Sequence, residues 1–544
     1  MKARLSLLTI VFTLLFLALN FKIYDIQINK GNIYSAKAES FNRLSDSLNA
    51  VRGNIYFTDK NGNQVQVAIN KEYPAIYAVP KEIKNPVEAA GELASVLSLD
   101  KTGLLSIFSK ENDPYESLLK KADPQLVEES VNLGIKGIYI NYETSRFYPF
   151  NNLAAQVLGF TAPNAEDSVL SGKYGIESYF NEELSGKSGI VKGDITERAQ
   201  AGKDIRLNLD INVQTKAESI LAAMLEQHSA EKGTIIVENP KTGKIIAMAN
   251  YPSFDPNNYS ESKLGNFINS AVQSIYEPGS VFKLITMSAG LDSNKLTPET
   301  TYYDKGSLTL NGRTIKNWDG KAHGLTTMTG VIEKSLNTGA AYAQKLIGKD
   351  LFYNYLVDFG LNTKTGIKLP GEVNGDIRKL KSSYKDIDFA TASYGQGVAI
   401  SPIQLISAVS AIANGGVLMK PLILAEEKPE IVRRVISEGA AKQVTEMMVS
   451  AVNKGINAKI ANYNVAGKTG TAQVPNPKTG GYMEGVYIHS YVGFAPAADP
   501  QFVILIKLDK PQVTLAANTV TIPFRELSEY LINYYNIPPD NLAQ

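Results

Sequence analysis

The sequence predicts an α+β protein: an N-terminal membrane anchor, an irregular α+β module without catalytic residues, and a larger domain with a mixed antiparallel sheet flanked by helices. Three observations predict it. Residues 5–21 form an uncharged apolar run. From residue 51 to residue 206, short strand-like and helical stretches alternate without a fixed period. From residue 207 to residue 544, strand-like segments lie at both ends with helical patterns between them, which implies a sheet closed by contacts distant in sequence.

Length and composition limit the possible classes of function. A chain of 544 residues, 44% hydrophobic and 20% charged, has room for roughly two to four globular domains. The formal net charge is +1, so the chain has no electrostatic footprint for nucleic acid. It has no cysteine, and its three histidines lie far apart in the sequence. Disulfides and thiolate catalysis are therefore excluded, and we expect neither a metal site nor a cofactor.

The N-terminus has the pattern of an uncleaved, single-pass anchor in the cytoplasmic membrane. Lys2 and Arg4 precede the apolar run, which predicts a cytoplasmic tail over residues 1–4 and places everything after the anchor outside. A cleaved signal peptide is the alternative, but no small-x-small cleavage site follows the run. Residues 22–50 are of mixed character, and we interpret them as a stalk.

Each of the two larger regions has its own pattern of elements. In the module over residues 51–206, strand-like runs at residues 74–80 and 137–143 accompany a helical stretch at residues 85–99. In the domain over residues 207–544, the pattern predicts two strands joined by an Asn-Pro-Lys-Thr-Gly turn, then three late strands and a closing helix. These segments are residues 233–252, 464–474, 489–497, 501–509 and 523–535.

Without cysteine, and without a GxSxG elbow, the plausible catalytic pair is a serine nucleophile with a lysine base. A lysine acts as a base only where burial or neighbouring cations lower its pKa. On a helix, the spacing Ser-x-x-Lys puts the amine beside the hydroxyl. That spacing occurs six times, starting at Ser98, Ser117, Ser229, Ser260, Ser280 and Ser382.

Ser280 differs from the other five serines in its surroundings. Pro278 and Gly279 predict a turn before it, and the nearly all-apolar residues 281–291 predict a buried helix after it. Lys283 would then be buried deeply enough for its pKa to fall. A helix that starts at the serine also offers free backbone N–H groups to an oxyanion. The other five lie in polar helical or loop segments, where a surface lysine near a surface serine is the simpler interpretation.

Two further triplets follow Ser280 in the chain. The first is Ser-Leu-Asn at residues 335–337, and the second is Lys-Thr-Gly at residues 468–470. Lys-Thr-Gly occurs five times, but only this copy lies in a strand-like segment of small residues that a substrate backbone could approach closely. Taken alone, each residue has a structural explanation, such as an N-cap for Ser280 or a turn for Asn337. The agreement of motif, order and context favours catalysis.

These motifs resemble those of the penicillin-binding proteins, the serine D,D-transpeptidases of cell-wall synthesis. EPGSVFK at 277–283, KSLNTG at 334–339 and AGKTGTAQ at 466–473 are similar to the three active-site motifs of that family. RGNIYFTDKNG at 52–62 and GKYGIESYFNEELSG at 172–186 are similar to the membrane-proximal module of its class B, monofunctional branch. The resemblance covers nearly the whole chain beyond the anchor, and implies a penicillin-binding, serine β-lactamase-like fold for the transpeptidase domain.

Within class B, the stretches PSFDPN and YEPGS look more like the division-type, or septal, subgroup than the elongation type. The chain departs from the family pattern at Val51, which replaces a usual proline, and at Lys60, which replaces an arginine. Both residues lie in the non-catalytic module, so they put nothing chemical in doubt.

The resemblance implies catalytic roles for five residues. Ser280 would attack the carbonyl of the penultimate D-Ala of a stem peptide while Lys283 takes its proton. Ser335 and Lys468 would relay the proton to the leaving amine, and Asn337 would hold the donor peptide and Lys283. An amine of a neighbouring stem peptide would then accept the acyl group and form the crosslink.

The resemblance also implies the binding groups and the partners. Thr469, Gly470 and Thr471 would bind the substrate and its terminal carboxylate, and the backbone N–H groups of Ser280 and Thr471 would form an oxyanion hole. β-Lactam antibiotics, which mimic D-Ala-D-Ala, would acylate Ser280. No glycosyltransferase domain is visible, so glycan polymerisation would come from a polytopic membrane polymerase of the SEDS type, working with division proteins.

Four alternatives stay open at the level of the sequence. An elongation-type class B enzyme has the same chemistry. A D,D-carboxypeptidase differs only in using water as the acceptor. A membrane-anchored β-lactam sensor would bind without turnover, and a β-lactamase would hydrolyse its acyl-enzyme quickly but would not need the anchor or the module over residues 51–206.

Overall fold

The computed structural model of the chain describes residues 50–110, 113–164, 170–192, 195–455 and 457–541, together with residues 12, 13, 15–17, 19, 20 and 22. By their contacts the residues divide into two units, one of residues 1–53 with 182–203 and one of residues 54–181 with 204–544. The predicted tail, anchor and stalk over residues 1–50 lie almost entirely outside the described residues. Among the described helices, none has the length and hydropathy to cross a membrane.

In the smaller unit, Arg52 and Gly53 contact the last residues of helix α8 (Asn181–Ser185). Arg52 Nη1 donates a hydrogen bond to Ser185 Oγ over 2.8 Å, and Gly53 N donates to Leu184 O over 2.8 Å. A short antiparallel hairpin of β7 (Ile190–Lys192) and β8 (Ile195–Glu197) follows.

The larger unit begins with a five-stranded sheet of order β3-β2-β1-β9, with β4 also paired to β2. Its strands are β1 (Ile55–Thr58), β2 (Gln64–Ala78), β3 (Glu116–Leu119), β4 (Ile138–Phe147) and β9 (Ile205–Asp210). The β1–β9 pair is parallel, with Ile55 opposite Ile205, so this pair joins the module to the start of the next domain. One face of β2 and β4 packs on α3 (Pro86–Leu97), α4 (Lys101–Phe108) and α5 (Pro124–Asn132).

A second five-stranded sheet forms the centre of the larger unit, and all its neighbouring strands are antiparallel. The order is β11-β10-β20-β19-β18, so β18 lies at an edge. The strands are β10 (Lys232–Glu238), β11 (Ile245–Tyr251), β18 (Ala466–Pro475), β19 (Tyr482–Ala495) and β20 (Phe502–Asp509). The predicted turn between the first two is an Asx turn, in which Asn239 Oδ1 accepts from the backbone N–H groups of Lys241 and Thr242, and Gly243 supplies a positive φ of 74°.

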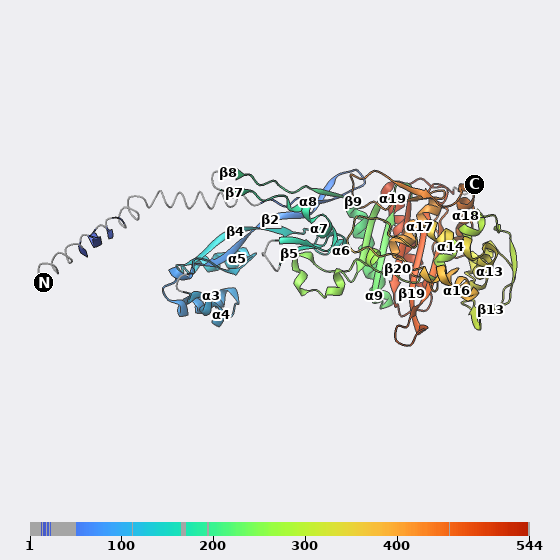
Figure 1. Ribbon diagram of the computed structural model, residues 1–544, viewed down its shortest axis with the longest axis horizontal. Coiled ribbons are helices and arrows are strands. Elements are labelled where there is room, and N and C mark those ends of the chain that lie inside the picture. The colour runs from blue at the N-terminus through green and yellow to red at the C-terminus, as the bar shows by residue number, and fades with distance from the viewer. Residues whose placement is uncertain are drawn as a thin grey trace. The chain divides into compact units, whose positions relative to one another are not determined.

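Helices cover both faces of this sheet (Figure 1). On one face, α9 (Ile211–His228) and α19 (Thr521–Tyr535) bury their apolar sides against Ile235, Ile504 and Ile506. On the other face, α17 (Pro402–Ala413) contacts β10, β19 and β20, and all but the last of its residues are buried. A helix with apolar residues on most of its sides needs such an interior position. The predicted α+β module and the predicted domain with an antiparallel sheet flanked by helices are therefore confirmed, whereas the predicted anchor lies outside the described residues.

The remaining elements connect and surround these layers. They are η2 (Pro80–Glu82), α6 (Ala155–Leu158), β5 (Phe160–Pro163), β6 (Leu170–Lys173), α7 (Gly175–Tyr179), η3 (Pro256–Glu261), η4 (Leu264–Phe267), α10 (Ser270–Gln273), η5 (Gly279–Phe282), α11 (Lys283–Asp292), β12 (Thr301–Asp304), β13 (Ser307–Leu310), β14 (Arg313–Lys316), β15 (Gly324–Thr327), α12 (Met328–Lys334), α13 (Asn337–Ile347), α14 (Lys349–Asp358), α15 (Arg378–Ser382), α16 (Asp386–Ala392), β16 (Val417–Met419), β17 (Ile431–Arg434), α18 (Glu438–Lys454) and η6 (Ala516–Asn518).

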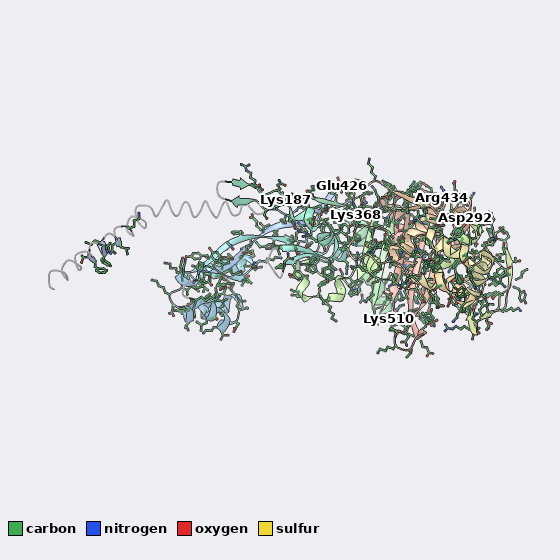
Figure 2. All side chains as sticks on the ribbon, viewed as in Figure 1. Lys187, Asp292, Lys368, Glu426, Arg434 and Lys510 are labelled. Atoms are coloured by element: carbon green, nitrogen blue, oxygen red, sulfur yellow. The ribbon has the colours of Figure 1, made fainter. Side chains whose placement is uncertain are left out.

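Helix α11 is fixed at its far end by Asp292, which lies beside the segment that carries Arg434 (Figure 2). Asp292 Oδ1 accepts from Ser437 N over 2.7 Å, and Asp292 Oδ2 accepts from Tyr355 OH over 2.7 Å. Ser437 is the N-cap of α18, and Tyr355 lies on α14. One carboxylate therefore ties three helices together at the base of α11.

Within the larger unit, the module packs on the catalytic part through aromatic rings, and a buried ion pair lies inside the module beside them. The ring of Phe160 stacks on that of Tyr259 with centroids 4.2 Å apart. Nearby, Arg146 Nε donates to Glu177 Oε1 over 2.6 Å, and both side chains are almost completely buried. Tyr148 OH donates to the same carboxylate oxygen over 3.2 Å. Arg146 and Glu177 thus form a buried charge pair.

Breaking this pair on one side is expected to destabilise the larger unit. The substitution Glu177→Leu leaves the Arg146 guanidinium buried without its countercharge, which typically lowers the free energy of unfolding by about 3–5 kcal/mol. The paired variant Arg146→Met/Glu177→Leu removes both charges and should recover most of the loss. Urea unfolding of the purified protein measures both effects. A paired variant as unstable as the single one would contradict this explanation.

Candidate active site

The turn before Ser280 lies between the loop that carries Gly395 and the edge strand β18. Gly279 has a φ of +61°, and its N–H donates to Gly395 O over 3.2 Å. An ideal Cβ on Gly279 would lie 3.0 Å from Thr471 O, and one on Gly470 would lie 2.8 Å from Pro278 O. Glycine at both positions therefore lets the serine turn and the strand approach each other closely. Ser280 follows in the 3₁₀ turn η5, half-buried.

Lys283, the first residue of α11, has no exposed surface. Its Nζ lies 2.9 Å from Ser280 Oγ, 2.7 Å from Ser335 O and 2.8 Å from Asn337 Oδ1. The Asn337 side chain is oriented by its Nδ2, which donates to Lys316 O over 3.0 Å, so its oxygen faces the amine. Burial, and secondarily the charge of Lys468, hold the pKa of Lys283 well below its usual range.

These contacts arrange the neutral amine as a base toward Ser280. A neutral amine has two N–H donors and one lone pair. The Ser335 carbonyl and the Asn337 amide oxygen can only accept, so the two N–H groups of Lys283 satisfy them. The lone pair is then left facing the hydroxyl of Ser280, 2.9 Å away.

Ser335 lies between two lysines. It ends helix α12 in the left-handed conformation, with φ +54°, which is strained for a residue other than glycine. Its Oγ lies 3.3 Å from Lys283 Nζ and 2.9 Å from Lys468 Nζ. Lys468 is 4% exposed, and burial lowers its pKa to about 7. At neutral pH Lys468 can therefore hold or release a proton, and the Ser335 hydroxyl lies between it and the amine of Lys283.

The other residues of the third motif follow Lys468 along strand β18. Thr469 O is 3.1 Å from Lys468 Nζ. Thr471 is half-buried, and its Oγ1 accepts from Ala516 N over 3.3 Å. Gly470 is buried, and a Cβ there would meet Ser490 Oγ at 2.4 Å. All eight residues predicted from the sequence thus lie on η5, α11, β18 and the junction between α12 and α13.

The other Ser-x-x-Lys copies lie elsewhere. Ser98 and Ser229 end helices α3 and α9, Ser260 lies in η3, and Ser382 ends α15. Ser117 lies on strand β3, not in the helical or loop segment expected from the sequence. Among the described residues, no three histidine, aspartate or glutamate side chains are grouped closely enough to hold a metal ion.

Sequence reasoning missed the carboxylate of Glu277, which lies beside the turn at Ser280. Glu277 Oε1 accepts from Gly397 N over 3.0 Å, and its Oε2 accepts from Tyr482 OH over 2.9 Å. It joins the serine turn to the loop after α16 and to the start of β19. Burial raises the pKa of Glu277 above its ordinary value. The only signal was its place in the first motif, because its partners lie 120 and 205 residues away.

Sequence reasoning also missed a set of residues, Asp304, Asn317 and Trp318, that hold the second motif around Asn337. Thr338 Oγ1 donates to Asp304 Oδ1 over 2.8 Å, and Asn317 Nδ2 donates to Asp304 Oδ2 over 2.8 Å. Asp304 is 1% exposed. Trp318 Nε1, next in the chain, donates to Lys334 O over 3.0 Å. The segment from Lys316 to Trp318 therefore braces the second motif along its whole length.

Comparisons with known proteins agree with this geometry. Residues 233–527 match the family model described as the penicillin binding protein transpeptidase domain, and residues 47–209 match that of the penicillin-binding protein dimerisation domain. The chain is 33% identical to stage V sporulation protein D of Bacillus subtilis, over 94% of this chain and 83% of that protein. It is 30% identical to the peptidoglycan D,D-transpeptidase FtsI of Buchnera aphidicola, over 98% and 95%.

Solved structures are similar in fold. Penicillin-binding protein 3 of Mycobacterium tuberculosis, in complex with aztreonam, matches with a TM-score of 0.70 and 26% identity over 90% of this chain and 97% of that one. Penicillin-binding protein 2X of Streptococcus thermophilus has a TM-score of 0.74 over 90% of this chain and 80% of that one.

The lowered pKa of Lys468 predicts how stability changes with pH. The unfolded chain holds this proton up to its ordinary pKa near about 10.4, whereas the folded chain loses it near about 7. The unfolded state therefore binds more protons in this window, and the contribution of Lys468 to the free energy of unfolding rises with pH, by up to about 1.4 kcal/mol per pH unit. The stability of the wild type relative to Lys468→Met should rise accordingly between pH 7 and 10.

Urea unfolding at several pH values measures this difference. The control is Lys459→Met, which removes an exposed lysine from the loop before β18. A wild-type advantage over Lys468→Met that stays flat or falls with pH would count against a buried neutral amine.

Proposed function

This chain belongs to the penicillin-binding protein family and is a class B peptidoglycan D,D-transpeptidase that binds penicillin, and we propose that Ser280 is the residue its substrates acylate. The observation that carries the proposal is the contact between Ser280 Oγ and the buried amine of Lys283. No other amine is this close to the Ser280 hydroxyl among the described residues.

In the first step, Ser280 Oγ forms a bond to the carbonyl carbon of the penultimate D-Ala, and its proton moves to the lone pair of Lys283. The neutral state of Lys283 is favoured by burial, and its two N–H groups stay on Ser335 O and Asn337 Oδ1. The oxyanion that develops is stabilised by the backbone N–H groups of Ser280 and Thr471. Donors of this kind are typically worth about 3 kcal/mol each.

In the second step, the bond to the terminal D-Ala breaks and its amine needs a proton. Ser335 Oγ supplies it and is reprotonated by Lys468, over the 2.9 Å contact between them. Ser335 Oγ also lies 3.3 Å from Lys283 Nζ, so this hydroxyl is in contact with both amines. The terminal carboxylate of the donor binds to Thr469, Thr471 and the cationic form of Lys468.

The acyl-enzyme then reacts with an amine of a neighbouring stem peptide, whose nitrogen forms the bond to the acyl carbon as the bond to Ser280 Oγ breaks. The amine gives up a proton to Lys468 through Ser335, and Lys283 returns its proton to Ser280, which forms the crosslink and restores the site. Water in place of the amine would give a carboxypeptidase, which uses the same residues. β-Lactams follow both steps, because the ring C–N bond breaks and its nitrogen takes the proton. They stop at the acyl-enzyme, because the opened ring stays attached through the acyl group and does not leave.

The wider role proposed here is septal cell-wall synthesis outside the cytoplasmic membrane. The division-type stretches of the sequence and the similarity to FtsI of Buchnera aphidicola support it. The apolar residues 5–21 would anchor the chain once in the membrane, and a polytopic SEDS-type polymerase would supply the glycan strands. Pairing with that polymerase should fail when residues 1–60 are exchanged while acylation survives. Unchanged co-purification would place the contact elsewhere.

Labelling with a fluorescent penicillin tests the nucleophile. Ser280→Ala should abolish covalent labelling, because among the described residues the only other hydroxyl at Lys283 is that of Ser335, which lies farther away, at 3.3 Å against 2.9 Å. The matched control is Ser260→Ala, which removes the serine of another Ser-x-x-Lys copy and should be labelled like the wild type. Equal labelling of Ser280→Ala and the wild type would show that the nucleophile is another residue. Rapid loss of the label from the wild type would favour a β-lactamase.

The rate of acylation should depend on pH in a bell shape. Activity needs Lys283 neutral, so the rate rises as this amine loses its proton, below its ordinary pKa. It also needs Lys468 protonated, so the rate constant falls about tenfold per pH unit above about pH 7. In Lys468→Arg, whose side chain stays charged, the fall on the alkaline side should move to higher pH or disappear. An unchanged alkaline limb in that variant would remove Lys468 from the relay.

A further inference from the structure

His489 is a fully buried side chain on β19 that the mechanism above does not use. It makes two contacts with the loop between β20 and α19. Nδ1 lies 2.9 Å from Thr519 Oγ1, and Nε2 lies 3.2 Å from Thr514 O. The ring therefore contacts the loop both before and after the short helix η6.

The partners determine the state of the ring. A carbonyl only accepts, so Nε2 carries the proton and donates to Thr514 O, and Nδ1 accepts from the hydroxyl of Thr519. Burial lowers the pKa of His489 to about 4, so the ring is neutral and keeps this tautomer at neutral pH.

The same loop holds the hydroxyl of Thr471. Ala516 N, which lies between the two contacted residues Thr514 and Thr519, donates to Thr471 Oγ1 over 3.3 Å. This bond occupies one lone pair of the hydroxyl and fixes its rotamer, while the hydroxyl proton stays available for an acceptor in the cleft. Thr471 lies directly opposite His489 in the ladder between β18 and β19, so both side chains lie on the same face of the sheet.

We propose that His489 is a positioning residue for carboxylate recognition: it fixes residues 514–519 so that Ala516 orients the hydroxyl of Thr471 toward the terminal carboxylate of the peptide or the β-lactam. The proposal rests on the function proposed above and adds a residue that touches neither the substrate nor the lysines. Because the link runs through Thr471, losing His489 should weaken recognition of the carboxylate and leave the attack by Ser280 intact.

The experiment compares benzylpenicillin with its methyl ester, which lacks the carboxylate. His489→Phe keeps a ring of similar shape and removes both nitrogens. It should lower the second-order rate constant of acylation about tenfold for the acid and less than twofold for the ester. In the Thr471→Val background, adding His489→Phe should cost nothing further for the acid. Equal losses for acid and ester, or a loss that persists without the Thr471 hydroxyl, would overturn the proposal.

Three controls separate this outcome from others. Thr519→Val removes the hydroxyl that lies 2.9 Å from Nδ1 and 3.2 Å from Ala516 O, so it loosens the same segment without changing the ring. It serves where His489→Phe does not fold, and it should show the same preference for the ester. His228→Gln changes a second buried histidine whose side chain makes no hydrogen bond to residues 514–519 in the described structure, and it should alter neither rate. Wild-type protein that is not acylated at Ser280 would contradict the proposed function itself, whereas the acid–ester comparison tests His489 alone.

Discussion

The amines of Lys283 and Lys468 lie on either side of the Ser335 hydroxyl, and both are shut off from water. Two ammonium groups this close would repel strongly in a medium of low dielectric constant, and each has already lost the hydration that favours its charge. The cluster therefore holds fewer protons than two free lysines would at neutral pH. In the mechanism proposed above, that shortage lets Lys283 act as the base and Lys468 as the proton donor.

Much of the surrounding architecture keeps the cluster dry and correctly oriented. Gly279 and Gly470 remove the side chains that would hold the nucleophile turn away from β18. The left-handed conformation of Ser335 directs its carbonyl and its hydroxyl to different amines. Asn337 cannot rotate without losing its bond to Lys316. Each lysine contact is thus fixed by a second contact, so little reorganisation is needed when charge moves.

The module and the catalytic part of the larger unit are joined where the chain approaches the nucleophile. Rings of Phe160 and Tyr259 stack, Asn257 Nδ2 donates to Tyr148 O, and Gln156 Nε2 donates to the backbone of Pro252 and Asn266. These catalytic-part residues lie in the segment that leads through α10 to the turn at Ser280. The buried Arg146–Glu177 pair stiffens the module side of the same junction.

The sequence alone determined the α+β fold class, the order of the late strands and the closing helix, because these depend on local periodicity. It also distinguished Ser280 among six copies of one spacing, by the turn before it and the buried helix after it, as the serine to propose. Only the tertiary structure decided the rest. Asn337 reaches Lys283 across 54 residues, Lys468 reaches Ser335 across 133, and Ala516 reaches Thr471 across 45. Burial lowers the pKa values of the two lysines, and contacts between distant segments produce the hydrogen bond of Tyr482 to Glu277 and the contacts of His489 with residues 514–519. No local pattern of residues encodes either effect.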